Sequence, residues 1–496
     1  MLIHFTTENN SNIREIFGCT HREIEFITYD SRRTVQNTAF FCIKGSMQDG
    51  HEYIKQAIIN GAAVIVGTDE TLFRKLEKQL PHITFVLAKD TQKAMSYYSQ
   101  LLNDFSCYKI STIAVTGTNG KTTVTSFIRY LLNQCGVAAG SIGTEGVWDD
   151  KQQRDFPHST HTTPEAPDLH YIFTEFVKEQ LNAAVLEVTS IAIAQQRVDG
   201  LMFDIGVHTN LTPEHIDYHS SYESYKQAKL KMFRQVRKAV VNKDDKGMGQ
   251  DIIDIFTGPL YTYSLKSNAD VTGKILEVTP AGTQLELKVK ENYYSVELPL
   301  FGEHNIYNFL AALCACLHKD ISVKSLLKHA PGITTPRGRL QIINTDTDYQ
   351  IIADFAHTPD ALDNIVRAAR SMRPNKLIVL IAANGVRDKS QQPQLLETMK
   401  GKADHLIVAV EHPDRFDRAA ILHDMLKDSQ GKEELITELY REDGVRKALE
   451  LAGKGDIVLL TGLGVLDHQI INGVEVPYSE IDIIHDYLEE HAIRNN

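Results

Sequence analysis

Residues 116–123 constrain the fold of this 496-residue chain more than any other segment. They read TGTNGKTT, follow the β-branched stretch 112–115 and lead into residues 122–134, which have helical spacing. A strand that passes through a glycine-containing turn into a helix is typical of an α/β fold. Backbone N–H groups in such a turn, aided by the positive end of the helix dipole, bind phosphate oxygens. The segment therefore predicts a site for a nucleoside triphosphate.

The residue types in this loop suit a triphosphate, although the loop is two residues shorter between its glycines than the general GxxxxGKT pattern. Lys121 supplies a positive charge for the outer phosphates, and the Thr122 hydroxyl is a ligand for Mg²⁺. An ordinary glycine turn is the competing interpretation, which the Gly-Lys-Thr sequence between strand and helix disfavours. The residues expected around ATP are Gly117, Thr118, Asn119, Gly120, Lys121, Thr122 and Thr123.

The rest of the chain alternates short buried strands with helical stretches. A cluster of Pro and Gly at 331–339 predicts a linker, and the two-residue period within 269–300 predicts an antiparallel hairpin. We expect an α/β fold of three domains, in which a central phosphate-loop domain has a mainly parallel sheet and the C-terminal domain is doubly wound and Rossmann-like. The predicted domains are 1–106, 107–337 and 338–496. The predicted strands are 37–43, 63–67, 112–115, 183–188, 204–207, 239–242, 351–355, 377–382, 406–410 and 457–460.

Composition narrows the choice of partners. Lys and Arg total 52 whereas Asp and Glu total 64, which gives a formal net charge of −12. A chain this acidic lacks the basic surface of a general nucleic-acid or anionic-membrane binder. Its six cysteines form no CxxC pair, no signal peptide is evident, and no apolar run approaches the roughly 18 residues that cross a bilayer. We expect a cytoplasmic monomer with reduced thiols and no nucleic-acid or membrane partner.

The loop GTNGKT resembles the ATP loop of the Mur ligases, which join amino acids to a nucleotide-sugar carboxylate. Six further motifs occur in the order typical of the tripeptide-synthetase branch of that family. Single motifs of this length are weak signals, whereas the ordered set is specific and covers nearly the whole chain. The motifs are DSR at 30–32, TTP at 162–164, LEVTS at 186–190, NLTPEHIDYH with YKQAKLKMF between 210 and 233, GR at 338–339 and DFAHTPDAL at 354–362.

The resemblance implies a reaction. ATP would transfer its γ-phosphoryl group to the D-Glu carboxylate of UDP-N-acetylmuramoyl-L-Ala-D-Glu, and an amino acid would attack the resulting acyl phosphate through its amine. The amino acid would be a diamino acid such as meso-diaminopimelate or L-lysine, and the product a peptidoglycan precursor. Phosphoryl transfer depends on positioning and charge neutralisation, so ATP and Mg²⁺ are the expected cofactors.

The resemblance also implies the catalytic residues, which are Lys121, Glu187, His215 and Lys229. Thr122, Glu187 and His215 would bind Mg²⁺ together with Lys229, which carries a carbamate in this family. Considered singly, these residues have plainer interpretations. Glu187 is then a salt-bridged core carboxylate, His215 a helix-capping histidine and Lys229 an exposed helical lysine.

Three sets of binding residues follow from the same resemblance. Asn305, predicted to precede a helix, would contact ATP together with Arg339, Asp354 and His357. The nucleotide-sugar substrate would contact Ser31, Arg32, Thr162, Thr163, Thr189, Gln195, Arg197 and Lys229. The incoming amino acid would contact Arg387, Glu411, Asp414, Arg415 and Gly464.

The sequence departs from the family mainly where the amino acid would bind. It reads EHPDR at 411–415 where diaminopimelate-adding members read DNPR, which displaces Arg415 by one position. Leu466 stands where those members have a glutamate, and Ile191 replaces a histidine. Two alternatives therefore stay open: a divergent ligase that uses another amino acid or carboxylate in a specialised pathway, and a non-catalytic nucleotide-binding relative. A folylpolyglutamate synthetase is less favoured, because it gives no reason for a DSR-bearing first domain.

Overall fold

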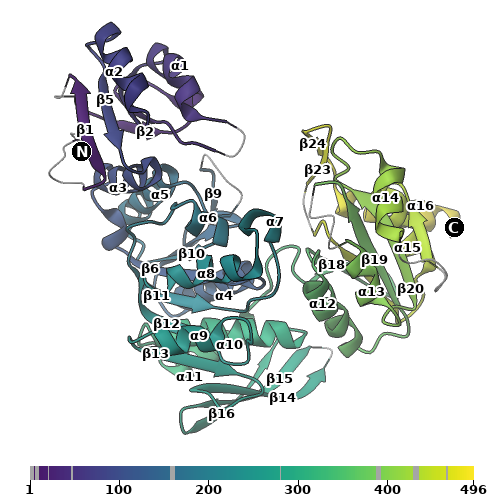
Figure 1. The fold of residues 1–496 in the computed structure, drawn as a ribbon. Coiled ribbons are helices and arrows are strands. Elements are labelled where there is room, and N and C mark those ends of the chain that lie inside the picture. Colours follow the sequence, from purple (N-terminus) through teal and green to yellow (C-terminus); the bar gives the residue numbers. More distant parts are fainter. Residues whose placement is uncertain are drawn as a thin grey trace.

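The computed structural model describes residues 5, 11–19, 22–45, 48–156, 162–279, 281–386, 392–427, 435–464 and 467–495. Within these ranges the chain forms three α/β domains, each built on its own sheet. Figure 1 shows them in chain order: the first in purple, the middle one in blue to teal, and the last in green to yellow. The expected fold class is confirmed.

The first domain has five strands in the order β1-β5-β4-β3-β2, of which only β1 runs antiparallel to its neighbour. One face of the sheet packs on α1 and α2 and the other on α3. The strands are β1 (Ile13–Gly18), β2 (Phe26–Thr28), β3 (Thr38–Phe41), β4 (Ala62–Gly67) and β5 (Thr84–Ala88), and the helices are α1 (Ile54–Ile59), α2 (Glu70–Gln79) and α3 (Thr91–Leu102).

The middle domain is built on an eleven-stranded sheet whose centre is parallel, as predicted. Antiparallel strands extend it at both edges, and they include the hairpin expected within 269–300. From edge to edge the strands are β16 (Asn292–Leu298), β15 (Gly282–Val289), β14 (Val271–Thr279), β13 (Leu260–Ser264), β12 (Val236–Asn242), β11 (Phe203–His208), β6 (Ser111–Thr116), β10 (Ala183–Glu187), β7 (Ala139–Gly143), β8 (Gly146–Trp148) and β9 (Gln153–Arg154).

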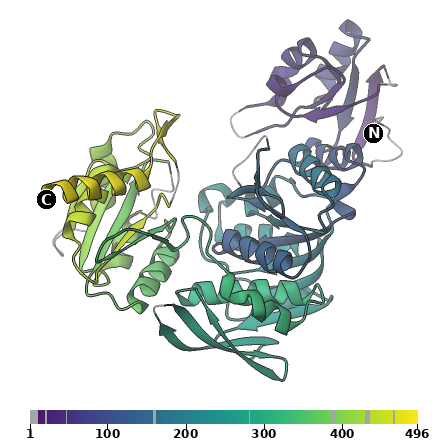
Figure 2. The same ribbon diagram turned by 180° about the vertical axis from the view of Figure 1, so that it is seen from behind.

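Helices cover both faces of the parallel part of this sheet, so every residue of the central strand β10 is buried and nearly all residues of its neighbours β6 and β11 are buried. Figure 2 shows α4 (Lys121–Gln134) and α10 (Glu303–Leu317) side by side across one face, where α11 (Val323–His329) joins them. The opposite face packs on α5 (Ala166–Lys178), α6 (Ser190–Ala194), α8 (Tyr222–Met232) and α9 (Gly249–Ile255). A short helix, α7 (Ile216–His219), precedes α8.

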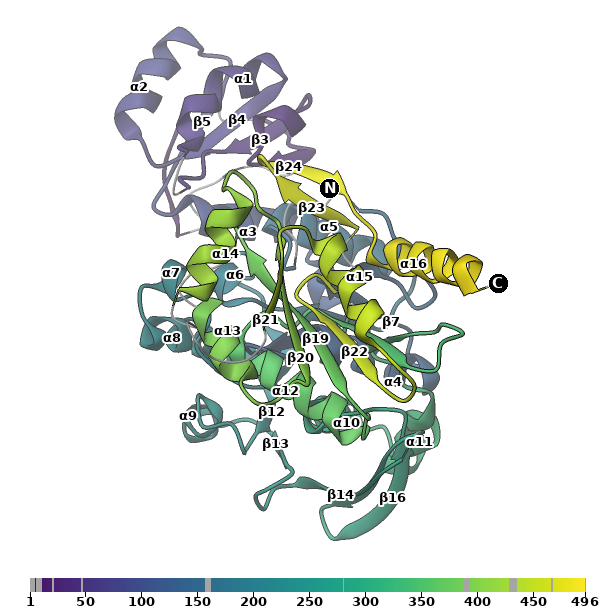
Figure 3. The same ribbon diagram turned by 90° about the vertical axis from the view of Figure 1, so that its right-hand side faces the viewer.

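The last domain has a six-stranded sheet that is parallel except for β17. Figure 3 shows α13 and α14 on one side of this sheet and α15 and α16 on the other, which is the predicted doubly wound arrangement. The strands in order are β17 (Gln341–Ile343), β18 (Gln350–Asp354), β22 (Ile457–Thr461), β19 (Leu377–Asn384), β20 (His405–Glu411) and β21 (Leu435–Glu438). The other elements are α12 (Pro359–Ser371), α13 (Gln392–Met399), α14 (Arg418–Leu426), α15 (Arg441–Leu451), α16 (Glu480–Asn495) and the hairpin β23 (His468–Ile471) with β24 (Val474–Pro477).

Polar contacts connect the three domains. The Arg33 guanidinium of the first domain lies 2.7 Å from the Asp168 carboxylate of α5. Between the middle and last domains, the Asn119 side-chain amide donates to Asp360 at the start of α12 over 3.1 Å. Phe301, two residues before the start of α10, packs into the apolar core around α12. These contacts hold the carboxyl ends of the parallel strands of both domains around one cavity, described below.

Candidate active site

The phosphate loop connects β6 to α4 and requires its two glycines. Gly117 has φ +153° and Gly120 has φ +87°. A Cβ atom on Gly117 would collide with the Thr209 hydroxyl, and one on Gly120 with the side chain of Asn308. Both positions therefore exclude larger residues on steric grounds, and α4 begins directly after Gly120, at Lys121.

The segment after β11 holds this loop in place. The backbone N–H of Asn119 donates to the side chain of Asn210 at 2.9 Å, and the N–H of Thr118 donates to the Asn210 carbonyl at 2.8 Å. The Thr118 hydroxyl bonds the Tyr225 hydroxyl at 2.9 Å. Two of the N–H groups in the loop thus bond to the scaffold, and those of the first turn of α4, from Lys121 on, have no acceptor within the helix.

Two lysines converge on the carbonyl of Gly117. The Lys121 ammonium donates to it at 2.9 Å and the Lys229 ammonium at 2.8 Å. Lys229 is only 1% exposed, so the interpretation as an exposed helical lysine is wrong. Burial and the nearby Lys121 charge hold the pKa of Lys229 well below its usual value, against the opposite effect of Glu214. A buried amine of lowered pKa is readily neutral, and the neutral form is the one that adds CO₂.

Glu187 is the last residue of β10 and is 1% exposed. Its carboxylate accepts hydrogen bonds from the Thr122 hydroxyl at 3.0 Å and from the backbone N–H of Thr144 at 2.8 Å. Among the described residues no cation pairs with it, so the interpretation as a salt-bridged core carboxylate is wrong. A hydroxyl and a carboxylate beside a phosphate loop fit Mg²⁺, which takes one or two carboxylates and completes its shell with phosphate oxygens and water. Within the described ranges, no group of three or more His, Cys, Asp or Glu side chains is placed to hold a metal ion.

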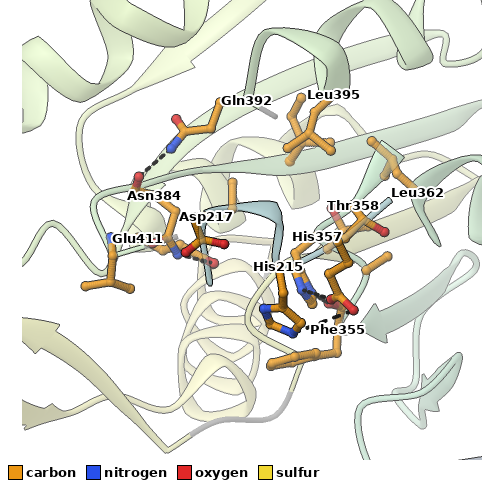
Figure 4. Close-up of a pocket in the computed structure, with 16 residues that line it drawn as sticks. His215, Asp217, Phe355, His357, Thr358, Leu362, Asn384, Gln392, Leu395 and Glu411 are labelled. Carbon is orange, nitrogen blue, oxygen red and sulfur yellow. Dashed lines mark hydrogen bonds and ion pairs between the residues drawn. The ribbon is translucent and has the colours of Figure 1, made fainter. Parts of the chain in front are cut away.

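His215 occupies the N-cap position of α7 with φ +54°, but its side chain makes no capping hydrogen bond there. The helix-capping interpretation is therefore wrong. Its Nε2 lies 3.7 Å from one oxygen of Glu214, whose other oxygen lies 3.8 Å from Nε2 of His357 in the last domain. Figure 4 shows both histidines in the wall of the cavity between the middle and last domains.

Glu214 is a functional candidate that the sequence interpretation missed. Burial alone would raise the pKa of its carboxyl group, but His357, Lys121 and His215 together lower that pKa to about 2. A charged carboxylate is therefore held between the phosphate loop and the last domain. The available signal was its place directly before His215 in the motif at 210–219.

Five residues predicted for the nucleotide-sugar substrate lie close together beside Glu187. The Thr163 hydroxyl donates to the Glu187 carbonyl at 2.9 Å and accepts from the N–H of Thr189 at 3.2 Å. Arg197 donates to the Thr163 carbonyl at 2.8 Å and to the Gln195 side chain at 2.6 Å. The hydroxyl of the remaining member, Thr162, forms a hydrogen bond of 3.2 Å with the Thr144 hydroxyl.

The two substrate residues predicted in the first domain lie on the short 3-10 helix Ser31–Arg33. Ser31 is buried, and its carbonyl accepts a hydrogen bond from Asn60 at 2.9 Å. The Arg32 side chain is 86% exposed and pairs with Asp30 at 2.8 Å. Arg32 is therefore open to an incoming anionic group, whereas the main chain of Ser31 is part of the domain scaffold.

The residues of the last domain that were predicted to contact ATP lie around the end of β18. Both carboxylate oxygens of Asp354 accept backbone N–H groups, from Leu340 at 2.6 Å and Ala356 at 2.7 Å. Burial raises the pKa of Asp354, and Arg339 opposes that shift. The Arg339 guanidinium lies 4.9 Å from the centre of the Phe355 ring. Asp354 thus shapes the turn that leads to His357.

The prediction that Asn305 precedes a helix is wrong. Helix α10 begins at Glu303, so Asn305 lies inside its first turn. Its side-chain amide donates to the Phe301 carbonyl at 3.0 Å, and its oxygen accepts from Asn308 at 3.3 Å. The sequence did not indicate that the helix begins before Asn305. The preceding Gly-Glu-His sequence resembles a turn more than the start of a helix.

A cavity of about 330 Å³ lies where the middle and last domains meet. Glu214 and His215 line its middle-domain side, and the ends of β19, β20 and β22 line the other side. Of the amino-acid residues predicted from sequence, Glu411 lines this cavity, whereas Asp414, Arg415 and Gly464 do not. Asp414 instead accepts the N–H of Gly473 at 2.7 Å, and Arg415 is exposed. Arg387 and the substituted Leu466 lie outside the described residues.

The fold and the site together define an α/β protein with a phosphate loop whose cleft is completed by a second parallel sheet. Comparison with known families gives the class more closely. The family model for the Mur ligase middle domain matches residues 115–316, that for the Mur ligase glutamate ligase domain matches 338–464, and that for the Mur ligase family catalytic domain matches 23–99.

Individual members of this family are similar to the chain over nearly its full length. UDP-N-acetylmuramoyl-L-alanyl-D-glutamate–2,6-diaminopimelate ligase 1 of Clostridium acetobutylicum is 31% identical over 96% of this chain and 97% of its own. The corresponding ligase of Geobacillus kaustophilus is 33% identical over 92% and 93%. The chain belongs to the Mur ligase family, as its motifs predicted.

Solved structures agree with this assignment. One of a UDP-N-acetylmuramoyl-L-alanyl-D-glutamate–2,6-diaminopimelate ligase covers 99% of this chain with a TM-score of 0.69 and 25% identity. The MurF ligase of Thermotoga maritima in complex with ADP shares the fold, with a TM-score of 0.63 over 95% of this chain. None of the helices in the described ranges is both long and apolar enough to span a bilayer.

Proposed function

We propose that this protein is an ATP-dependent ligase that adds a diamino acid to UDP-N-acetylmuramoyl-L-Ala-D-Glu in peptidoglycan precursor synthesis. The carboxylate of D-Glu attacks the γ-phosphorus of ATP, which releases ADP and forms an acyl phosphate. The amine of the incoming amino acid then attacks the acyl carbon, and phosphate leaves as the amide forms. The similarity to ligases named for UDP-N-acetylmuramoyl-L-alanyl-D-glutamate and 2,6-diaminopimelate supports this substrate pair.

The observation that carries the proposal is the cluster of Lys121, Lys229 and Glu187 around the start of α4. Lys121 would turn from the Gly117 carbonyl to the β- and γ-phosphates, where its charge offsets that of the transferred group. Thr122 and Glu187 are the residues that would hold Mg²⁺, with His215 and a carbamylated Lys229 as further ligands. When bound, Mg²⁺ supplies additional positive charge at the phosphoryl oxygens.

The remaining site residues have supporting roles in this proposal. Thr162, Thr163, Thr189, Gln195 and Arg197 hold the sugar-peptide part, and Ser31 and Arg32 the uridine part. Asn305, Arg339, Asp354 and His357 close on ATP from the two sides of the cleft. Arg387 would hold the α-carboxylate of the amino acid, and Glu411, Asp414, Arg415 and Gly464 would be the further residues that contact it. We keep the domain limits 1–106, 107–337 and 338–496 as part of the same proposal.

The direct test supplies ATP, Mg²⁺, UDP-N-acetylmuramoyl-L-Ala-D-Glu and a panel of amino acids that contains meso-diaminopimelate, L-lysine and L-ornithine. We expect one phosphate for each nucleotide product, and a product mass raised by one amino acid less one water. Folded protein that yields neither phosphate nor product with every amino acid contradicts the proposal.

One observation favours a second candidate, a ligase of the same chemistry with a different amino acid. Arg415, which would have to reach a distal carboxylate of diaminopimelate, is exposed and does not line the cavity. Incorporation of a non-family amino acid in the panel, with no incorporation of meso-diaminopimelate or L-lysine, would favour this candidate.

A further inference from the structure

One ion pair joins the first domain to the middle domain. The Arg33 guanidinium makes two contacts with the Asp168 carboxylate, with nitrogen–oxygen distances of 2.7 and 3.2 Å. The Asp168 side chain is only 9% exposed and that of Arg33 is 32% exposed. A two-pronged pair fixes orientation as well as distance, because the planar guanidinium matches the two carboxylate oxygens. The pair therefore sets how the two segments that carry it lie relative to each other.

Both partners are close in sequence to residues proposed to hold the nucleotide-sugar substrate. Arg33 is the last residue of the short 3-10 helix that begins with Ser31 and Arg32. Asp168 lies in the first turn of α5, shortly after Thr163. The proposed uridine residues and the proposed sugar-peptide residues are thus each held on a helical segment that ends or begins at this ion pair.

Apolar packing does not fill this side of the interface between the two domains. A cavity of about 690 Å³ lies between β2, α3 and α5, and both Arg33 and Asp168 are in its wall. Figure 1 shows α3 beside α5 where the two domains meet. Because the interface is hollow here, the relative position of β2 and α5 depends strongly on the polar contacts around the cavity.

A second polar contact between the domains involves the segment 195–197. Arg197 donates to the Thr163 carbonyl and to the Gln195 side chain, within the group of residues proposed for the sugar-peptide part. Gln196, between them in sequence, donates instead to the Asp90 carboxylate of the first domain at 2.8 Å. The contacts between the domains are therefore built into the same segments that form the proposed substrate site.

We propose that Arg33 and Asp168 are positioning residues that hold the two parts of the nucleotide-sugar site at the separation that the substrate spans. A ligand that contacts both domains gains affinity because the second contact is made within one complex, and this gain falls when the spacing is free to vary. A ligand that contacts only the first domain does not depend on that spacing. This inference rests on the ligase function proposed above and adds two residues that need not touch the substrate.

The test compares two ligands by calorimetric titration: UDP-N-acetylmuramoyl-L-Ala-D-Glu, which would span both domains, and uridine diphosphate, which would reach only the first. We expect Arg33→Met and Asp168→Asn each to raise the Kd of the whole substrate by about tenfold and that of uridine diphosphate by less than about twofold. Asp168→Asn alone decides the matter if Arg33→Met does not fold. An equal rise for both ligands, or no rise for the whole substrate, overturns the proposal.

A double variant separates the ion pair from other effects of the two side chains. If the residues act through one pair, Arg33→Met combined with Asp168→Asn should raise the Kd of the whole substrate by about tenfold, and not by about a hundredfold. The controls are Arg74→Met, which breaks only ion pairs within the first domain, and Glu175→Gln on α5, and both should keep the wild-type Kd. A hundredfold rise in the double variant would show independent effects and overturn the proposal.

Turnover provides a second readout. In each single variant the KM for the nucleotide-sugar substrate should rise by about tenfold, whereas kcat and the KM for ATP should stay within about twofold, because the phosphate loop and the reacting carboxylate remain on the middle domain. A fall in kcat with an unchanged KM for the nucleotide-sugar substrate contradicts a positioning role.

Failure of the proposed ligase function has a different signature. In that case the wild-type protein binds UDP-N-acetylmuramoyl-L-Ala-D-Glu but yields no product with any amino acid, and the binding comparison still tests the role of the ion pair. A wild-type protein that does not bind this nucleotide overturns the proposal, because there is then no such substrate to position.

Discussion

The phosphate loop and the cavity of the last domain are built in opposite ways. The loop is one continuous segment. Its conformation requires Gly117 and Gly120, and hydrogen bonds from the segment after β11 hold it in place. The cavity is formed by the ends of separate strands. One of its lining residues, Glu411, lies 3.6 Å from the buried Arg441, which also pairs with Glu480 at 2.9 Å, and these three residues are distant in sequence. The chemistry of a contiguous site can be recognised from its sequence motif. The chemistry of a site assembled from distant residues becomes visible only in the folded structure.

The largest expected effect is a loss of catalytic activity, and it belongs to the phosphate loop. Lys121→Ala removes the loop ammonium, and we expect kcat to fall by about a thousandfold or more, as for the loss of a cation at a transferred phosphoryl group. Phosphate release measures this change. Lys231→Ala, on the exposed side of α8, is the control and should be near wild type. Turnover by Lys121→Ala close to that of the control would favour the non-catalytic alternative.

The next effect concerns stability and belongs to the last domain. Arg441→Met leaves Glu411 and Glu480 buried without their shared cation, and we expect a loss of about 3–5 kcal/mol in the free energy of unfolding. Arg446→Met on the same helix breaks only partly exposed pairs with Glu442 and Glu490, and should cost less than about 1 kcal/mol. Urea unfolding compares them. Equal stability of the two variants would refute the argument that Arg441 stabilises the fold by offsetting the buried carboxylates of Glu411 and Glu480.

Acid should destabilise the middle domain through His170 of α5. Neither of its ring nitrogens has a hydrogen-bond partner among the described residues, and burial lowers its pKa to about 3. Because the unfolded chain takes up a proton near pH 6.5 that the folded chain refuses, stability falls as pH drops below 6.5, by about 1.4 kcal/mol for each pH unit.

His170→Phe should remove this dependence, so that between pH 7 and pH 5 the wild type loses about 2 kcal/mol more unfolding free energy than the variant. Urea unfolding at the two pH values measures it. His423→Gln, which changes an exposed residue of the last domain, should keep the wild-type slope. If the unfolding free energies of the wild type and His170→Phe fall equally between pH 7 and pH 5, His170 is not held neutral in the folded protein.

The smallest effect tests the contact that joins the two regions. Asp360→Ala removes the acceptor of the Asn119 side chain, and we expect kcat/KM for ATP to fall about fivefold, which corresponds to one hydrogen bond of about 1 kcal/mol. Steady-state kinetics measure it. Asp363→Ala, on the same helix but paired with Lys402 and Arg367, is the control. A fall no larger than that of the control would exclude a role of Asp360 in ATP use.

The fold could be predicted well from sequence, because buried strands and the phosphate loop each have a recognisable local sequence pattern. Side-chain environment could not be predicted in the same way. The burial of Lys229 depends on the packing of α8 against the loop, and the partners of Glu187 come from α4 and the turn after β7. Arg441 has no local signal at all, since its role arises from pairing with Glu480 of another helix.

The most direct test of the central claim follows the oxygen atoms of the substrate. UDP-N-acetylmuramoyl-L-Ala-D-Glu labelled with ¹⁸O in its D-Glu carboxylates is converted with ATP, Mg²⁺ and the amino acid, and the released phosphate is analysed by mass spectrometry. If the phosphate loop activates the carboxylate as an acyl phosphate, each phosphate carries one ¹⁸O atom from the substrate. Phosphate without label, formed together with the amide product, would contradict this account.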